Sequence, residues 1–227
     1  WNLDRTLSWN LSFFVSLFIY LIWLITKLPY VFLFLLKIMA RTPSNKISLG
    51  SVAPDFNLLD VTSDSNVSLT DTKGNVGTVI MFICNHCPYV KHVNPTISRL
   101  AKDHNGDDIK FIAISSNDVI NYPDDSPEKM KINAIENDFN FPYLYDETQE
   151  TAKAYDAACT PDFYLYDSNL ELVYRGQLDN SRPGNDIESD GSDMVNAIQC
   201  LKDGIENKEL QKPSIGCNIK WKWQKKI

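Results

Sequence analysis

Two cysteines, Cys84 and Cys87, stand three positions apart directly after the apolar residues 79–83. The apolar run is typical of a buried strand, and the apolar spacing after the cysteines predicts a helix over residues 90–104. The pair is therefore expected where a strand ends and a helix begins. Free backbone N–H groups and the positive end of the helix dipole stabilise a thiolate at such a place. A lowered cysteine pKa gives a nucleophile at neutral pH, so this spacing predicts thiol chemistry.

Alternating strands and helices must position this pair. The pattern predicts strands at residues 79–83, 109–115, 142–145, 159–167 and 172–175, helices at residues 90–104, 148–157 and 192–203, and a polar turn at residues 71–77. A further helix begins at Ser126-Pro127-Glu128, with Ser126 as its N-cap. This order favours an α/β fold with a central mixed β-sheet flanked by helices on both faces. We expect one domain over residues 45–210 and a C-terminal tail, residues 211–227, that packs back on it.

The composition is that of a folded, acidic protein. The chain has 227 residues, 44% of them hydrophobic, and a formal net charge of -7. An acidic domain without a basic patch binds nucleic acid poorly, so no nucleic-acid partner is expected. An odd number of widely spaced cysteines is not a secreted disulfide framework, and unpaired cysteines fit a cytoplasmic dithiol protein. The five cysteines are Cys84, Cys87, Cys159, Cys200 and Cys217.

The N-terminal segment, residues 1–38, differs from the rest of the chain. Residues 6–26 carry no charge, and residues 28–36 are apolar again after Lys27. Residues 6–36 are therefore a candidate membrane anchor with a single transmembrane helix, and the positive charges after it orient the following domain towards the cytoplasm. The alternative is that Met39 begins the native protein and that the upstream segment is a leader. Both interpretations stay open at this point.

Three sequence signals, taken in order, resemble a known fold. Ala53-Pro54-Asp55-Phe56 resembles the opening strand of the peroxiredoxin-like (alkyl hydroperoxide reductase / thiol-specific antioxidant) branch of the thioredoxin fold. The Cys-x-x-Cys resembles the thioredoxin redox centre, and Thr160-Pro161 resembles the cis-proline that faces the redox cysteines. The resemblance covers residues 48–205. It implies a thioredoxin-like fold and a cysteine-based oxidoreductase.

Longer phrases also resemble a peroxiredoxin-like group. The phrases are Cys84-Asn85-His86-Cys87-Pro88, Ala158-Cys159-Thr160-Pro161-Asp162-Phe163, Arg175-Gly176-Gln177-Leu178, Ser181-Arg182-Pro183-Gly184-Asn185 and Pro213-Ser214-Ile215-Gly216-Cys217-Asn218. The chain also departs from the typical sequences of peroxiredoxins and of thioredoxins. Typical peroxiredoxins have Thr or Ser three residues before the peroxidatic Cys, and if Cys87 is that residue, Cys84 takes the hydroxyl's place. Typical thioredoxins have Gly-Pro between the cysteines, where this chain has Asn85-His86.

The first interpretation is a thiol–disulfide oxidoreductase. We expect Cys84, at the helix start and the more exposed of the two, to attack a substrate disulfide, and Cys87 to resolve the mixed disulfide. A partly cationic His86 between them stabilises the thiolate and raises the reduction potential. As the resemblance implies, Pro161 withholds an N–H from the substrate backbone and leaves the carbonyl of Thr160 free to pair with it. The expected partners are a protein disulfide and an upstream thiol reductant such as thioredoxin.

The second interpretation is a thiol peroxidase that reduces a hydroperoxide. Either Cys87 or Cys84 forms a sulfenic acid, and a second thiol condenses with it. The candidates for that second thiol are the other cysteine of the pair, Cys159 and Cys217. Arg175 or Arg182 would lower the thiol pKa and polarise the peroxide. Arg175 is explained equally well as a surface residue of a strand.

The third interpretation is metal binding. Cys84 and Cys87, with His86 or His92, are residue types that hold copper(I) or zinc. His92 is expected on a different side of the helix from Cys84, which weakens this alternative. The redox interpretations need no organic cofactor, because the electrons travel as thiols.

Overall fold

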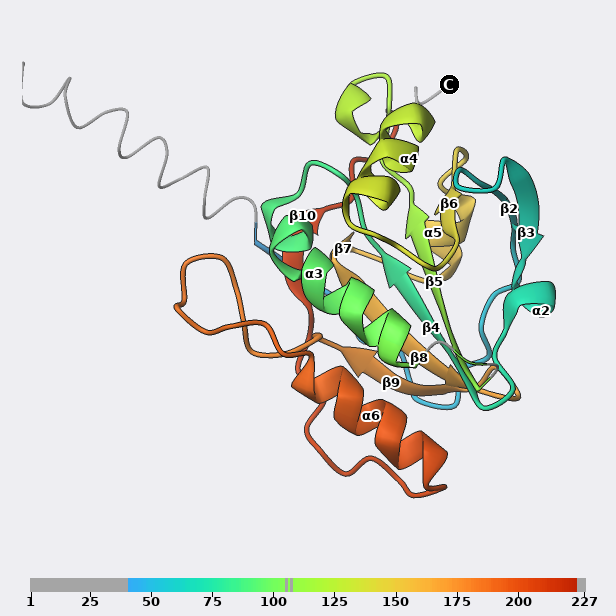
Figure 1. Ribbon diagram of the computed structural model, residues 1–227, viewed down its shortest axis with the longest axis vertical. Coiled ribbons are helices and arrows are strands. Elements are labelled where there is room, and N and C mark those ends of the chain that lie inside the picture. The colour runs from blue at the N-terminus through green and yellow to red at the C-terminus, as the bar shows by residue number, and fades with distance from the viewer. Residues whose placement is uncertain (1–40, 105, 107, 224–227) are drawn as a thin grey trace, which may run out of the picture. The chain divides into compact units, whose positions relative to one another are not determined.

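A central mixed sheet of seven strands organises the fold (Figure 1). The computed structural model describes residues 41–104, 106 and 108–223, and a compact unit begins at Thr42. The strand order is β3-β2-β6-β5-β4-β8-β9. The strands are β2 (Asn57–Asp60), β3 (Ser65–Ser68), β4 (Gly77–Phe82), β5 (Ile109–Ser115), β6 (Tyr143–Tyr145), β8 (Asp162–Asp167) and β9 (Leu172–Gly176).

Strands β4, β5 and β8 form the buried middle of this sheet. β4 pairs parallel with β5 and antiparallel with β8, and every residue of β4 is buried. Alternate side chains of a strand point to opposite faces, so Val79 and Met81 join one core cluster while Ile80 and Phe82 join the other. A strand with two buried faces reads as a continuous apolar run, which is why the sequence predicted it well.

Helices cover both faces, as expected from the order of elements. The helices are α2 (Leu69–Thr72), α3 (Pro88–Asp103), α4 (Pro127–Glu136), α5 (Glu150–Ala154) and α6 (Ser192–Lys202). Helices α3, α4 and α6 contribute buried side chains to the cluster that contains Val79, whereas α2 and α5 contribute to the cluster that contains Ile80. Ser126 caps α4 by accepting a hydrogen bond from the backbone N–H of Lys129. The residues expected as a polar turn at 71–77 instead include the end of α2, because Ser68 caps this short helix.

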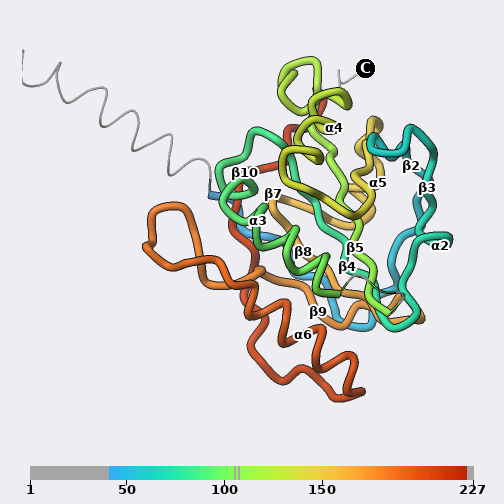
Figure 2. The backbone as a smooth tube through the Cα atoms, in the orientation of Figure 1, coloured from blue at the N-terminus to red at the C-terminus, as the bar shows by residue number. Residues whose placement is uncertain are grey.

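A second, smaller sheet lies beside the end of β4. It has the order β1-β10-β7, with β1 (Thr42–Pro43), β10 (Ile215–Asn218) and β7 (Cys159–Thr160). The expected strand at residues 159–167 is therefore divided at Pro161, since β7 belongs to the small sheet and β8 to the large one. Strand β10 comes from the C-terminal tail and pairs antiparallel with both neighbours. Figure 2 shows this red segment passing next to β7 near the start of α3.

The expected membrane anchor, residues 6–36, lies outside the described residues. Within residues 41–104, 106 and 108–223, no helix is long and apolar enough to cross a bilayer.

Candidate active site

The turn between β4 and α3 presents both redox cysteines. Pro88 is the first residue of α3, and Cys87 is its N-cap with extended backbone angles. Proline favours this first helical position because its missing N–H would have had no partner there. Residues 84–86 consequently lie before the helix. The expectation that Cys84 starts the helix is wrong, because Cys87 holds the N-cap, and both residues are buried, with 1% of Cys84 and 0% of Cys87 exposed.

Thr160 contacts both sulfur atoms. Its hydroxyl oxygen lies 3.3 Å from Sγ of Cys84, and its carbonyl oxygen accepts a hydrogen bond of 3.1 Å from the Cys87 thiol. The Thr160–Pro161 peptide bond is cis. The structure thus brings together Cys84, Cys87, Thr160 and Pro161, as the sequence predicts.

Strand β10 places a third thiol at this centre. Cys217 lies opposite Thr160 in the pairing of β10 with β7, and its thiol lowers the pKa of Cys87. A Cβ atom on Gly216 would lie 1.9 Å from the carbonyl oxygen of Thr160. Only glycine therefore allows β10 to approach this closely. The carbonyl of Thr160, which we expected to be free for a substrate backbone, faces β10 and the Cys87 thiol instead.

The pKa values of the three thiols shift in opposite directions. Hydrogen bonds from the thiols of Cys217 and Cys84, followed by backbone N–H groups, hold the pKa of Cys87 well below its usual range despite its burial. The hydrogen bond to Cys87, together with burial, raises the pKa of Cys84 and likewise that of Cys217. The N-terminus of α3 favours the same thiolate. These pKa directions favour Cys87 as the attacking thiolate, whereas the sequence alone favours Cys84.

His86 pairs with a buried carboxylate beside the sulfurs. Its Nδ1 lies 2.6 Å from Oδ2 of Asp125, and its ring stacks on Tyr122 with centroids 5.6 Å apart. The hydrogen bond to Asp125 raises the pKa of His86 although burial opposes the shift, and the charge of Cys87 acts in the same direction. The Asp125 carboxylate thus favours the protonated form of the imidazole beside the cysteines.

Asp125 is the site residue that the sequence did not reveal. It is fully buried and accepts hydrogen bonds from the backbone N–H groups of Asn85 and His86, from the His86 ring and from the Asn117 side chain. Burial raises the pKa of Asp125, but these hydrogen bonds outweigh it and the net shift is downward. Its position in a short 3-10 turn (Pro123–Asp125) gives no local sequence signal of this role.

The remaining candidate cysteines are less suited to attack. Sγ of Cys159 lies 3.6 Å from the carbonyl oxygen of Pro161, and burial raises the pKa of Cys159 well above its usual range. Cys200 belongs to α6, far along the chain from the redox turn, and is partly exposed. Of the three thiols beyond the pair, Cys217 is the one whose side chain lowers the pKa of Cys87.

Arg175 forms a buried ion pair rather than occupying the surface. Its guanidinium donates to the carboxylate of Asp162 at 3.0 Å and to the hydroxyl of Tyr164 at 2.9 Å. Its other partners are the carbonyl oxygens of Asn45 and Asp156, and the Arg175 residue is 6% exposed. None of these partners is a cysteine, so the structure does not bring Arg175 together with the redox pair as the peroxidase interpretation expects.

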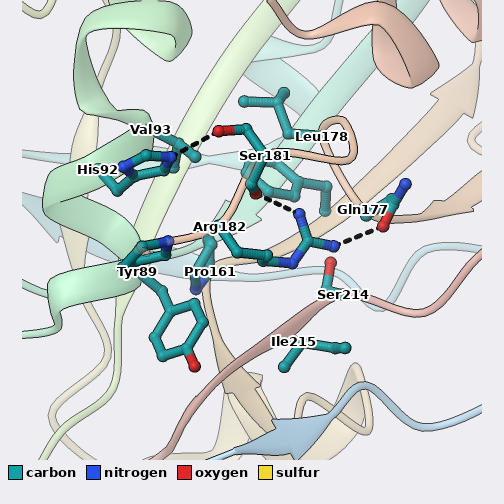
Figure 3. A pocket seen from close by; sticks show the side chains of 12 residues that line it. Tyr89, His92, Val93, Pro161, Gln177, Leu178, Ser181, Arg182, Ser214 and Ile215 are labelled. Atoms are coloured by element: carbon teal, nitrogen blue, oxygen red, sulfur yellow. Dashed lines mark hydrogen bonds between the residues drawn. The ribbon is translucent and has the colours of Figure 1, made fainter. Parts of the chain in front are cut away.

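A small hollow adjoins Pro161 (Figure 3). It lies between the start of α3, the segment 177–183 and the beginning of β10. Arg182 donates to the carbonyl oxygens of Asp179 and Ser181 and to the side chain of Gln177. His92, considered above as a metal ligand, lies in this hollow with Nε2 2.6 Å from Oγ of Ser181.

One group of metal-ligand side chains occurs within the described part of the chain. It comprises Cys84, His86 and Asp125, whose ligand atoms lie within 4.8 Å of one another. The expected set, Cys84 and Cys87 with His86 or His92, differs because it included Cys87 and did not include Asp125. His86 and Asp125 are already bonded to each other, so a zinc or copper ion would have to replace that hydrogen bond.

The comparisons with known proteins agree with this geometry. Residues 49–175 match the AhpC/TSA family. An uncharacterized conserved protein from Geobacillus kaustophilus is 55% identical, with a TM-score of 0.80 over 82% of this chain and 99% of that chain. A hypothetical protein from Sinorhizobium meliloti 1021 is 40% identical, with a TM-score of 0.78 over 80% and 98% of the respective chains.

A more distant structure defines the fold. The thioredoxin domain of a thiol-disulfide oxidoreductase from Bacteroides vulgatus has a TM-score of 0.53 at 17% identity, covering 67% of this chain and 99% of that chain. This likeness confirms the expected thioredoxin-like fold. None of the curated proteins matches the chain. With a redox turn, a neighbouring cis-proline and a family match over more than half its length, the chain belongs to the AhpC/TSA family of thiol-dependent oxidoreductases.

Proposed function

We propose that the protein is a thiol–disulfide oxidoreductase in which Cys87 attacks the substrate and Cys84 resolves the intermediate. The observation that carries this proposal is that one residue, Thr160, contacts both sulfurs next to the N-terminus of α3, Cys84 through its hydroxyl and Cys87 through its carbonyl oxygen. A thiolate with a second thiol in contact is the arrangement that closes a short disulfide.

The reaction requires two exchanges. The Cys87 thiolate attacks one sulfur of a substrate disulfide, forms a mixed disulfide and expels the other substrate sulfur as a thiolate. Cys84 loses its proton to the departing thiolate and attacks the Cys87 sulfur, which yields the Cys84–Cys87 disulfide and expels the second substrate sulfur as a thiolate that takes a proton from water. The substrate gains two electrons and the pair loses two. An external dithiol reductant, such as a thioredoxin, restores the reduced pair by the same exchanges in reverse.

His86 has a supporting role in this chemistry. Its protonated ring lowers the free energy of the Cys87 thiolate through charge. Asp125 keeps that proton on the ring and also fixes the backbone of Asn85 and His86 between the cysteines. Both residues therefore act through Cys87 rather than on the substrate.

Thiol peroxidase activity is the second candidate, and burial favours it. Because Cys84 and Cys87 are 1% and 0% exposed, a small oxidant reaches them more readily than a protein disulfide does. In this reaction Cys87 reduces a hydroperoxide to an alcohol and becomes a sulfenic acid, which condenses with Cys84 and releases water. The contacts of Arg175 with Asp162 and Tyr164 weigh against this alternative, since they remove one expected partner of the peroxide.

The cellular setting follows from the thiol chemistry. We place the domain in the cytoplasm, where the odd number of cysteines is compatible with a reducing environment. Residues 6–36 would anchor it to a membrane if they are retained in the mature protein.

A rate comparison tests the proposal on the full-length chain. The reduced protein is mixed with hydrogen peroxide or with insulin, and peptide mass spectrometry locates any new bond. Fast exchange with insulin, slow reaction with peroxide and a Cys84–Cys87 bond are expected. Cys87→Ser should abolish both reactions, whereas Cys84→Ser should accumulate the mixed disulfide, and Cys200→Ser is the matched control. Peroxide consumption that is faster than disulfide exchange would make the protein a peroxidase, and zinc or copper retained after dialysis would reopen the metal alternative.

A further inference from the structure

Strand β10 occupies an edge that is central to the redox site. It pairs with β7 through Cys217 opposite Thr160 and Asn218 opposite Cys159, and with β1 on its other side. Gly216 permits this packing, because any larger residue would collide with the carbonyl group of Thr160. The C-terminal strand β10 is therefore held at the site by backbone pairing and close packing.

Three sulfurs consequently surround one residue. Cys84 contacts the hydroxyl of Thr160, Cys87 contacts its carbonyl oxygen, and Cys217 lies opposite it in the neighbouring strand. Cys87 is the middle sulfur, because both other thiols act on it and lower its pKa. Cys217 is 7% exposed, compared with 1% for Cys84 and 0% for Cys87.

We propose that Cys217 is a third redox-active thiol, which displaces Cys84 from its disulfide bond with Cys87. The proposal rests on the proposed function, since it begins from the Cys84–Cys87 disulfide. The Cys217 thiolate attacks the Cys87 sulfur, a Cys87–Cys217 bond forms, and Cys84 leaves as a thiolate that takes up the proton lost by Cys217. The exchange changes no net oxidation state and needs no further reactant.

This exchange gives the reductant a more accessible disulfide. Both cysteines of the Cys84–Cys87 bond are buried, so a reductant has little access to either sulfur. The Cys87–Cys217 bond instead ends on β10, a four-residue strand whose first residue, Ile215, lines the hollow next to Pro161 (Figure 3). An attacking thiolate at Cys217 restores Cys87 as the leaving group, and Cys87 is the best leaving thiolate of the three because its pKa is the lowest.

Cys159 is the nearest competitor for this role. It belongs to β7, but its thiol is engaged with the carbonyl oxygen of Pro161, two residues along the same strand-turn segment. Since Cys159 and Thr160 are consecutive strand residues, their side chains point to opposite sides. Cys217 rather than Cys159 is therefore the expected partner of Cys87.

Disulfide mapping in a Cys84→Ser variant tests the proposal. The folded, reduced full-length variant is treated with one equivalent of diamide, which oxidises two thiols to a disulfide. The remaining thiols are blocked with N-ethylmaleimide, and peptides are identified by mass spectrometry. We expect an intrachain Cys87–Cys217 bond that is absent from Cys84→Ser/Cys217→Ser and still present in Cys84→Ser/Cys200→Ser. Circular dichroism verifies that each variant is folded.

The wild-type protein supplies the second half of the test. Limited oxidation should yield both the Cys84–Cys87 and the Cys87–Cys217 bonds, and Cys217→Ser should yield the first alone. If wild type forms the Cys84–Cys87 bond and reduces insulin while Cys84→Ser gives only free thiols, a Cys87–Cys159 bond or intermolecular dimers, the third thiol is rejected and the proposed function stands. If wild type forms the Cys87–Cys217 bond alone, Cys84 has no redox role, and both the proposed function and the exchange fail.

Discussion

Cys217 lies opposite Thr160 across the pairing of β10 with β7, and this relationship closes the sheet edge next to the redox cysteines. A substrate chain that paired with Thr160 would have to displace the protein's own strand. Displacing β10 breaks few backbone contacts, because this strand has four residues and pairs with only two residues on each side. Access for protein disulfides and the position of the third thiol are therefore controlled by the same strand.

The acidity of Cys87 should depend on Cys84. In Cys84→Ala one thiol donor to the Cys87 thiolate is lost, and a hydrogen bond to a charged group contributes about 1.5–3 kcal/mol. The pKa of Cys87 is consequently expected to rise by about one to two units. The measurement is the pH dependence of alkylation by iodoacetamide, followed by peptide mass spectrometry. A fast phase that disappears in Cys84→Ser but persists in Cys87→Ser would show that the roles have been assigned the wrong way round.

Gly216→Ala should loosen the C-terminal strand. The added Cβ would lie 1.9 Å from the carbonyl oxygen of Thr160, and that atom belongs to the backbone and cannot rotate away. We expect a loss of about 1–3 kcal/mol in the free energy of unfolding, faster amide hydrogen exchange across β10 and faster alkylation of Cys87 by bulky maleimides. Gly106→Ala is the matched control, since nothing lies within 4 Å of a Cβ there. Equal maleimide rates in the two variants would contradict the view of β10 as a cover.

Asp125→Asn should lower the pKa of His86. The hydrogen bond with Asp125 raises that pKa from 6.5, and the ion pair is complete only while His86 is protonated. A group whose folded pKa is raised contributes its full stabilisation below the unfolded pKa and loses it as the pH rises through the folded pKa. The wild type should thus lose this stabilisation at pH values above about 6.5, and the variant should not. The His86 ring signals in an NMR titration check the pKa, and urea unfolding at several pH values checks the stability.

Arg175→Met should destabilise the fold without a specific effect on the thiols. Removing one partner of a buried ion pair costs about 3–5 kcal/mol, because the other charge stays buried. Burial already raises the pKa of Asp162 to about 6. The folded variant therefore binds a proton at Asp162 more readily than the unfolded chain does. The loss of stability should consequently diminish as the pH falls from 7 to 5. Arg99→Met, which breaks the exposed pair with Asp103, should cost under about 1 kcal/mol. A slowed reaction of Cys87 in a stable Arg175→Met protein would restore a catalytic role for this arginine.

Local patterns predicted the elements that carry the site. The apolar residues before Cys84 and the helical spacing after Cys87 located the strand and helix that meet there, and Ser126 with Pro127 marked the start of α4. The sequence analysis expected Cys84 at the start of the helix. Pro88 instead begins the helix one residue after Cys87, so Cys84 lies before it.

Contacts between distant residues were beyond such patterns. Asp125 reaches the backbone of Asn85 over 40 positions of sequence, and its neighbours in the chain resemble an ordinary acidic helix start. Cys217 was identified only as a tail cysteine, because the pairing of a four-residue strand with β7 leaves almost no periodic signal. Arg175 was misplaced for a similar reason, since its partner Asp162 lies on the adjacent strand.

Thr160 contacts the two redox cysteines through chemically separate groups, its hydroxyl for Cys84 and its carbonyl for Cys87. A change of side chain at this one position can therefore retune the first sulfur while the second keeps its backbone partner. Related sequences could differ in oxidising strength through residue 160 alone, with the rest of the thiol centre unaltered.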